Sequence, residues 1–350
     1  MNCSSTARFS LLLLLILVIA SGCKDETPDD DPDGGRPGDT TAKPAELPDT
    51  TGLPPFDAQN AYTMVERQVA IGTREPNSEG AAKAIAFYKE ELSKYADDVK
   101  LQEFTEVGYN GVELKLTNII ASFNPTATTR ILLCAHWDSR PRADMDSDPT
   151  DRDKPILAAN DGASGVGVLL EMARVMKANT PTIGVDIVLF DGEDYGDGKI
   201  DDIARYFLGA KYFSKNLPEG YRPAFGILLD MVGDKAAEFK KEELSRKHAP
   251  AVVDMIWRSA DHLNLPSFKQ VDGQTVRDDH IPLNEVANIP TVDIIDGDLV
   301  GHVSSDPNRK YWHTSDDTMK NISAETLGQV GRLLTYIIYK VVPAELARAT

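Results

Sequence analysis

The sequence predicts an α/β fold: a single globular domain with a central, mostly parallel mixed β-sheet flanked by helices. Short apolar runs rich in β-branched residues alternate with longer segments of helical apolar spacing, and this alternation is typical of parallel sheets. The run 185–190 is short and strongly apolar, which predicts a buried strand. Asp191-Gly192-Glu193-Asp194 follow it directly, at the end of the strand where open α/β sheets bind their ligands.

The spacing of apolar residues, helical or strand-like, predicts the other elements along the chain. Strands are expected at 99–104, 113–123, 131–135, 225–231 and 290–295, and helices at 58–71, 78–95, 166–176, 204–215, 250–264 and 324–342. The second of these helices carries Ile85, Tyr88 and Leu92 along one face. The spacing in segment 238–245 is compatible with either a strand or a helix. Polar loops are expected at 139–154, 274–280 and 311–317. Neither an internal repeat nor a second folded domain is evident.

The N-terminus has the pattern of a secretion signal. Arg8 precedes an apolar run at 9–20, which is short for a membrane span. The run ends in Ala20-Ser21-Gly22-Cys23, which resembles a bacterial lipobox. We therefore expect a lipoprotein signal peptide at 1–22 and a lipid on Cys23; the alternative is an ordinary secretory signal with an incidental cysteine. Cys134 would then remain alone in a strand, as an inert core residue.

Residues 24–55 are dense in Asp, Pro, Gly and Thr and nearly free of large apolar residues. Such a segment cannot bury enough surface to fold, so we expect a disordered tether at 23–55 and the catalytic domain at 56–350. We also expect a monomer in the bacterial cell envelope, attached to a membrane only through its lipid anchor, on the periplasmic face or at the cell surface. The formal net charge of −18 argues against a nucleic-acid partner.

Acidic residues and histidines follow several of the predicted strands. They are His136 and Asp138, Asp161, Glu193 and Asp194, Asp230, Asp278 to His280, and His313. A lone Asp after a strand is usually a cap, and a lone His is usually a satisfied polar residue. Several such strand ends together are the ligand set that zinc needs, because catalytic zinc takes three protein ligands and keeps one open position. The residues alone therefore favour a metal-dependent hydrolase or transferase.

Six segments sharpen this expectation: LLCAHWDSR, NDGASGVGVLLEMAR, VLFDGEDYG, ILLDMVGD, VRDDHIPL and YWHTSDDT, in order across 131–318. They resemble the zinc-dependent exopeptidases of the M28 superfamily and, within it, the bacterial glutaminyl cyclases. Asp-Asp-His-Ile-Pro together with Trp-His-Thr indicates the cyclase branch. The resemblance implies conversion of an N-terminal glutamine of peptides or proteins to pyroglutamate, with release of ammonia.

The resemblance also assigns roles by position. It implies one zinc bound by Asp161, Asp194 and His313, a general acid/base at Glu193, neighbouring carboxylates at Asp230 and Asp278, and an aromatic pocket wall at Trp312. The animal members of the family carry Glu where Asp194 stands. They also carry a tryptophan soon after the acidic pair that GDGKIDDIARYF lacks, so we expect Tyr206 or Phe207 to shape the pocket instead.

His136 and Asp230 match positions at which the aminopeptidases of the superfamily bind a second metal. We expect His136 to hydrogen-bond, because cyclases use one zinc. A dinuclear zinc aminopeptidase, in which metal-bound water attacks the first peptide bond, stays open as the alternative enzyme. A surface lipoprotein that binds peptides without catalysis is the alternative outside enzymes.

Overall fold

The structure, a computed structural model, describes residues 46–198 and 203–349. Its helices are α1 (Ala58–Ile71), α2 (Glu79–Ser93), α3 (Ala163–Ala178), α4 (Leu208–Lys215), α5 (Glu243–His248), α6 (Pro250–His262), α7 (His280–Glu285), α8 (Ala324–Tyr336) and α9 (Val342–Ala349). Its strands are β1 (Asp98–Val107), β2 (Glu113–Phe123), β3 (Arg130–His136), β4 (Gly184–Phe190), β5 (Gly226–Asp230), β6 (Phe239–Lys241), β7 (Phe268–Asp272) and β8 (Thr291–Ile295). The predicted signal peptide at 1–22 and the predicted lipid on Cys23 lie outside the described residues.

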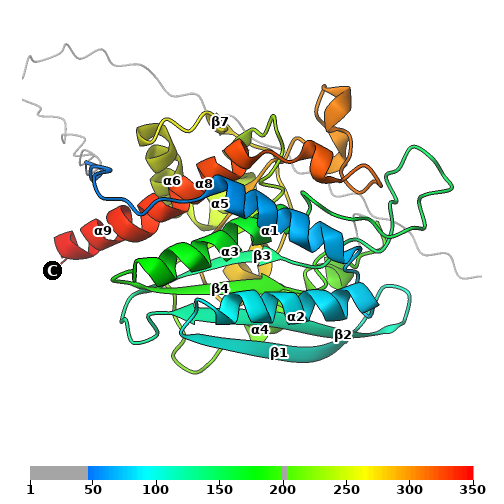
Figure 1. Cartoon of the computed structure of the whole chain (residues 1–350), viewed down its shortest axis with the longest axis horizontal. Coiled ribbons are helices and arrows are strands. Elements are labelled where there is room, and N and C mark those ends of the chain that lie inside the picture. The colour runs from blue at the N-terminus through cyan, green and yellow to red at the C-terminus, as the bar shows by residue number, and fades with distance from the viewer. Residues whose placement is uncertain (1–45, 199–202, 350) are drawn as a thin grey trace, which may run out of the picture. The chain divides into compact units, whose positions relative to one another are not determined.

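A six-stranded sheet organises the folded unit and confirms the predicted α/β class. Its strand order is β1-β2-β4-β3-β5-β8 (Figure 1). Strands β4, β3, β5 and β8 are parallel, whereas β1 pairs antiparallel with β2 and β2 with β4. The register places Leu133 beside Ile187 of β4 and Ile227 of β5. The carboxyl ends of β3, β4 and β5 therefore reach the same edge of the sheet.

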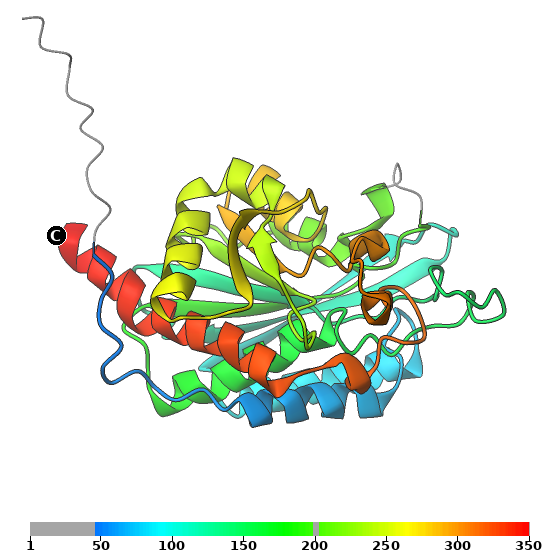
Figure 2. The same ribbon diagram turned by 90° about the horizontal axis from the view of Figure 1, so that it is seen from above.

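Helices cover both faces of this sheet, as Figure 2 shows from above. Side chains alternate along each strand, so Ile131 and Leu133 of β3 pack into the larger core, with α1, α2, α3 and α8. Leu132 and Cys134 point to the other face, where they join a smaller core with α4 and α7. Cys134 is a buried free thiol, as predicted. Because both faces are covered, β3 is apolar throughout its central part.

Two helices that cover the larger core begin at capping side chains. The Asp57 carboxylate accepts the backbone N–H of Gln59 and Asn60 at the start of α1. The Ser78 hydroxyl accepts the N–H of Ala81 at the start of α2. Each cap satisfies N–H groups that have no partner within the helix, and a cap of this kind typically contributes about 1 kcal/mol.

Four segments differ from their predicted form. The predicted helix 204–215 is divided into a 3₁₀ turn (Ile203–Arg205) and α4, because Phe207 adopts a φ of +58° and donates its N–H to the Glu193 carbonyl. Strand β7 and helix α7 were not predicted, and β7 pairs with the three-residue β6. The predicted C-terminal helix 324–342 is divided into α8 and a π-helical turn (Ile337–Val341), and the chain then continues as α9.

Part of the predicted tether belongs to the folded unit. Leu47 and Leu53 are partly buried against the larger core. The Tyr336 hydroxyl donates to the Pro48 carbonyl, and Arg348 donates to the Glu46 carbonyl at 2.6 Å. Residues 46–55 therefore belong to the folded unit, although the predicted boundary is at 56, because they contact the core and the C-terminal helices.

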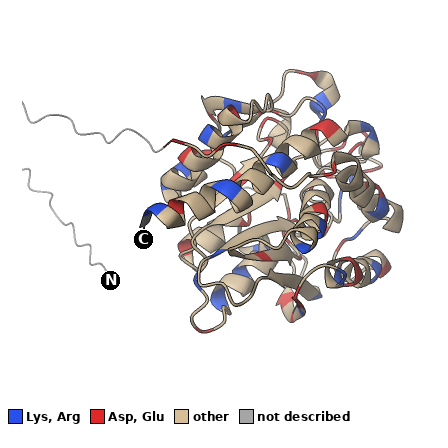
Figure 3. Cartoon of the chain, turned by 60° about the vertical axis from the view of Figure 1, so that its left-hand side comes forward, with Lys and Arg blue, Asp and Glu red and all other residues tan. Residues whose placement is uncertain are grey.

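The ribbon in Figure 3, coloured by residue type, shows acidic and basic residues interspersed along the helices. Within residues 46–198 and 203–349, no helix has the length and apolar character needed to cross a membrane.

Candidate metal centre

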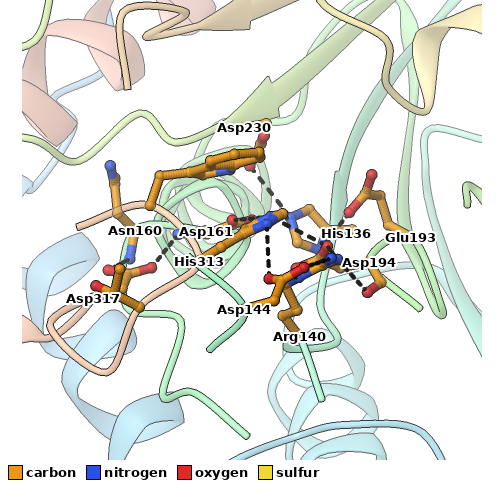
Figure 4. Close-up of polar contacts among 12 residues, drawn as sticks. His136, Arg140, Asp144, Asn160, Asp161, Glu193, Asp194, Asp230, His313 and Asp317 are labelled. Carbon is orange, nitrogen blue, oxygen red and sulfur yellow. Dashed lines mark hydrogen bonds and ion pairs between the residues drawn. The ribbon is translucent and has the colours of Figure 1, made fainter. Parts of the chain in front are cut away.

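The predicted site residues converge at the carboxyl edge of the parallel strands. His136 and Asp230 end β3 and β5, and Glu193 and Asp194 follow β4. Asp161 comes from the loop before α3, and His313 comes from the loop before α8. Figure 4 shows these side chains pointing toward one another. The arrangement follows from the parallel register, which brings separate strand ends to one edge.

One buried group has the geometry of a zinc site. His313 Nε2 lies 3.6 Å from Asp161 Oδ2 and 3.4 Å from Asp194 Oδ1. Zinc–ligand bonds of about 2.0–2.1 Å at tetrahedral angles put ligand atoms about 3.3 Å apart. Asp161 Oδ2 and Asp194 Oδ2 are buried without a hydrogen-bond partner in the described structure. These three residues therefore fit zinc in both distance and donor chemistry.

A second buried group shares Asp161 with the first. His136 Nε2 lies 3.1 Å from Asp161 Oδ1 and 3.3 Å from Asp230 Oδ1. The Asp161 carboxylate thus turns one oxygen to each histidine. These distances suit a hydrogen-bonded histidine and a second metal ion equally well.

The electrostatics of the first group favour binding of a cation. Burial and Arg140 lower the pKa of His313, so its imidazole is neutral and can coordinate. Burial raises the pKa of Asp194 to about 6, although His313 and Arg140 act in the opposite direction. Burial and the charge of Asp230 raise the pKa of Asp161. A divalent cation would supply the positive charge that these buried carboxylates need.

Glu193 has the properties of a proton-transfer group. Its side chain keeps 12% exposure and lines the pocket. Burial raises the pKa of Glu193 well above its ordinary value, and Asp194 and Asp278 raise it further, while His136 lowers it. The pKa of Asp278 is also raised well above its ordinary value, first by burial and then by Asp230. A carboxyl group of this kind can accept and return a proton near neutral pH.

Two buried aspartates hold the loops of the candidate metal centre: Asp138, which we named without assigning it a role, and Asp317, which we did not name. Asp138 accepts the backbone N–H of Glu193 at 3.1 Å and of Asp194 at 3.2 Å. Asp317 accepts the N–H of Asn160 at 2.9 Å and of Asp161 at 3.0 Å. Both lie within the quoted motifs, at HWD and HTSDD. Their roles depend on which loops meet, so residue spacing alone could not reveal them.

Arg140 and Asp144 form a further layer behind the ligands, which sequence reasoning also missed. The Arg140 guanidinium donates to Asp194 Oδ1 at 2.6 Å and forms two hydrogen bonds with Asp144, at 2.7 and 2.6 Å. Asp144 Oδ1 lies 3.6 Å from His313 Nδ1. Arg140 and His313 together hold the pKa of Asp144 below its usual range, against the effect of burial. Such contacts orient a ligating histidine and carboxylate.

Gly162 is required where α3 approaches His136. Its φ is +69°, and a Cβ there would lie 2.6 Å from His136 Cε1 and 2.7 Å from Nε2. Any larger residue would displace the imidazole, which accounts for glycine in the NDG motif.

A pocket of about 540 Å³ opens onto the candidate metal centre. Trp312 lines it, with its ring stacked on His313 at 3.5 Å between centroids and 22° between planes. Tyr206 and Phe207 both line the pocket, so both aromatic residues named as replacements reach it. The Tyr206 hydroxyl accepts a hydrogen bond from Arg140 at 3.3 Å. The pocket has the size and mixed lining of a small-molecule or peptide-terminus site.

The model of peptidase family M28 matches residues 118–338, which include all the ligand candidates. The chain belongs to this family. Its fold is similar to that of a Zn-dependent exopeptidase from Parabacteroides distasonis, with 40% identity, a TM-score of 0.78, and coverage of 82% of this chain and 99% of that one. Glutaminyl cyclase from Tannerella forsythia is 42% identical, with a TM-score of 0.76 and coverage of 82% and 99%.

Among curated proteins, aminopeptidase YwaD of Bacillus subtilis is 28% identical over 224 residues, which are 61% of this chain and 42% of YwaD. Glutaminyl-peptide cyclotransferase of Bos taurus is 23% identical over 263 residues, 67% of each chain. The chain therefore spans less than half the length of the first and about two thirds of the second. The names of its relatives include both enzyme classes considered from the sequence.

Proposed function

We propose that this protein is a zinc-dependent glutaminyl cyclase, which converts the N-terminal glutamine of a peptide or protein to pyroglutamate and releases ammonia. The observation that carries the proposal is one pocket containing Glu193, the Asp161–Asp194–His313 group and the Trp312 ring. The likeness to the Tannerella forsythia glutaminyl cyclase supports the same assignment.

In this reaction the substrate provides the attacking group. The α-amine of the N-terminal glutamine attacks its own γ-amide carbon, and the bond from that carbon to the amide nitrogen breaks. The pocket contributes by holding the side chain folded toward the amine, because orientation of tethered groups lowers the barrier. Trp312, Tyr206 and Phe207 provide the apolar walls for this conformation and exclude water.

Glu193 moves the proton. It accepts a proton from the attacking amine and delivers it to the departing NH2, which leaves as NH3. The raised pKa of Glu193 matches this double role. Asp138 positions Glu193 by accepting its backbone N–H, and Asp278, whose own pKa is raised, keeps a proton nearby.

We propose one zinc per chain, held by Asp161, Asp194 and His313. When bound, it would supply Lewis-acid polarisation of the γ-carbonyl. Arg140 and Asp144 hold the ligand side chains in place, and Asp317 holds the Asp161 backbone. His136 then remains hydrogen-bonded between Asp161 and Asp230.

A dinuclear aminopeptidase is the second candidate function. The observation that favours it is the His136–Asp161–Asp230 group, whose distances of 3.1 and 3.3 Å would also fit a metal. In that enzyme Glu193 would deprotonate the water that attacks the first peptide bond.

Product analysis separates the two candidates. With Gln-initiated peptides we expect ammonia and a product lighter by one NH3, with the next peptide bond intact, and we expect no reaction with Leu- or Ala-initiated peptides. Asn-initiated peptides serve as a control and should also fail, because they would have to close a strained four-membered ring. Free leucine from Leu-peptides without ammonia from Gln-peptides would establish the aminopeptidase.

We further propose that the protein acts as a monomer in the bacterial cell envelope, anchored through a lipid on Cys23. The sequence Ala20-Ser21-Gly22-Cys23 after a short apolar run supports this placement.

A further inference from the structure

An arginine lies at the mouth of the pocket, in the segment of chain that precedes α7. Arg277 is exposed and lines the pocket, while its neighbours Val276 and Asp278 are buried. The backbone here is fixed, because Val276 donates its N–H to the Glu242 carboxylate at 3.0 Å and Gln274 donates its side-chain amide to the Gly297 carbonyl. The Arg277 side chain therefore projects from a rigid wall.

Arg277 contrasts with the other charges of the pocket. The described carboxylates that line it are Asp144, Asp161, Glu193, Asp194, Asp230 and Asp278. Arg140 is the other lining arginine, and Asp144 and Asp194 already bind it. Arg277 makes no hydrogen bond or ion pair within the described part of the chain. The pocket thus combines an acidic floor with an available cation at its mouth.

A peptide bound for cyclisation would meet these charges in a set order. Its N-terminal glutamine lies on the floor beside Glu193, and each further residue advances the chain by about 3.3–3.6 Å toward the mouth. We propose that Arg277 selects peptides with an acidic side chain at the second or third position. The inference rests on the proposed cyclase function and names the substrates that the site prefers.

The expected preference is modest, because Arg277 is exposed. A solvent-exposed ion pair changes a binding constant by a factor of about 1.4 to 5. Without Arg277, the carboxylates of the pocket would repel an acidic peptide. High salt should remove the preference, since the screening length falls to about 3 Å at 1 M.

The test compares three amidated peptides, Gln-Glu-Ala, Gln-Ala-Ala and Gln-Lys-Ala, and three further peptides with the variable residue at the third position. Amidation removes the C-terminal carboxylate, so only the variable side chain changes the charge. For the full-length wild-type chain with zinc, kcat/KM for ammonia release should be about two- to fivefold higher for the Glu peptide than for the Lys peptide in at least one series. Arg277→Gln should lower this ratio to one or below, and Arg277→Glu should invert it.

Arg332→Glu is the matched control, since it makes the same charge change at an exposed position of α8 that does not line the pocket. Its ratio should equal that of the wild type. An unchanged ratio in Arg277→Glu would overturn the inference. An equal loss of rate for all peptides would also overturn it, because Arg277 would then contact the peptide backbone.

Binding provides a readout that does not depend on turnover. The dissociation constants of the fluorescently labelled peptides for Glu193→Gln, with and without Arg277→Glu, should show the same inversion. If the wild type releases no ammonia from any Gln peptide, the proposed function fails, and the binding ratio still decides the role of Arg277.

Discussion

Asp317 should control zinc affinity without touching the metal. Its carboxylate is 1% exposed and accepts the adjacent N–H groups of Asn160 and Asp161, at 2.9 and 3.0 Å. In Asp317→Asn the single side-chain carbonyl can accept one of these bonds, and its NH2 group then faces the other N–H. A buried N–H without an acceptor costs about 1–3 kcal/mol. The Asp161 loop can lower this cost by moving so that the N–H finds another acceptor. The Asp161 carboxylate is then no longer in position to bind zinc.

We therefore expect the zinc dissociation constant of Asp317→Asn to rise about 10- to 100-fold, the usual effect of losing a residue that orients a ligand. This range corresponds to about 1.4–2.8 kcal/mol of binding free energy. Competition with a chromophoric chelator, starting from metal-free protein, measures the constant directly.

Asp316→Asn provides the matched control for the same chemical change. The Asp316 side chain is 69% exposed and pairs with Lys320 on the surface, so its zinc affinity should stay within twofold of wild type. Thermal unfolding of both variants shows whether any loss is a general loss of folding. Zinc affinity within threefold of wild type for Asp317→Asn would refute the reasoning.

Four further predictions concern the site, the anchor and the fold. Glu193→Gln should lower kcat by about 10²–10⁴-fold while zinc content and thermal unfolding stay nearly unchanged; a variant that keeps more than a tenth of the wild-type rate would contradict the proton-transfer role. Metal analysis after dialysis should give one zinc per chain, whereas two zincs, one of them lost in His136→Ala, would favour the dinuclear enzyme. Cys23→Ser should move the protein from the membrane to the soluble fraction of a Gram-negative host; an unaltered membrane fraction would argue against lipidation. Burial raises the pKa of Asp279 to about 8 and that of Asp296 to about 7, the latter against the effect of Arg309. The folded state therefore binds protons more tightly than the unfolded state does. The free energy of unfolding, measured by urea titration, should fall as pH rises from 5 to 9. An increase over that range would show that these carboxyls are ionised in the folded state.

The sequence alone determined the features that depend on local periodicity and on motifs. It predicted the limits of α1 and β2 correctly, because helical and alternating apolar spacing are visible within a single segment. It also predicted that Asp161, Asp194 and His313 would share one site, because parallel strand ends meet at one edge and the motifs resemble those of a known family. These three residues do converge.

Tertiary structure alone decided the features that depend on contacts between distant segments. Asp317 and Asp161 are 156 residues apart, and no local pattern distinguishes Asp317 from its exposed neighbour Asp316. The break at Phe207 arises because its N–H bonds to the Glu193 carbonyl, and this contact overrides the helical period of 204–215. The contacts of residues 46–55 with α8 and α9 likewise order a segment whose composition favours disorder. In each case the deciding partner is supplied by the folded chain, so its effect cannot be read from the segment itself.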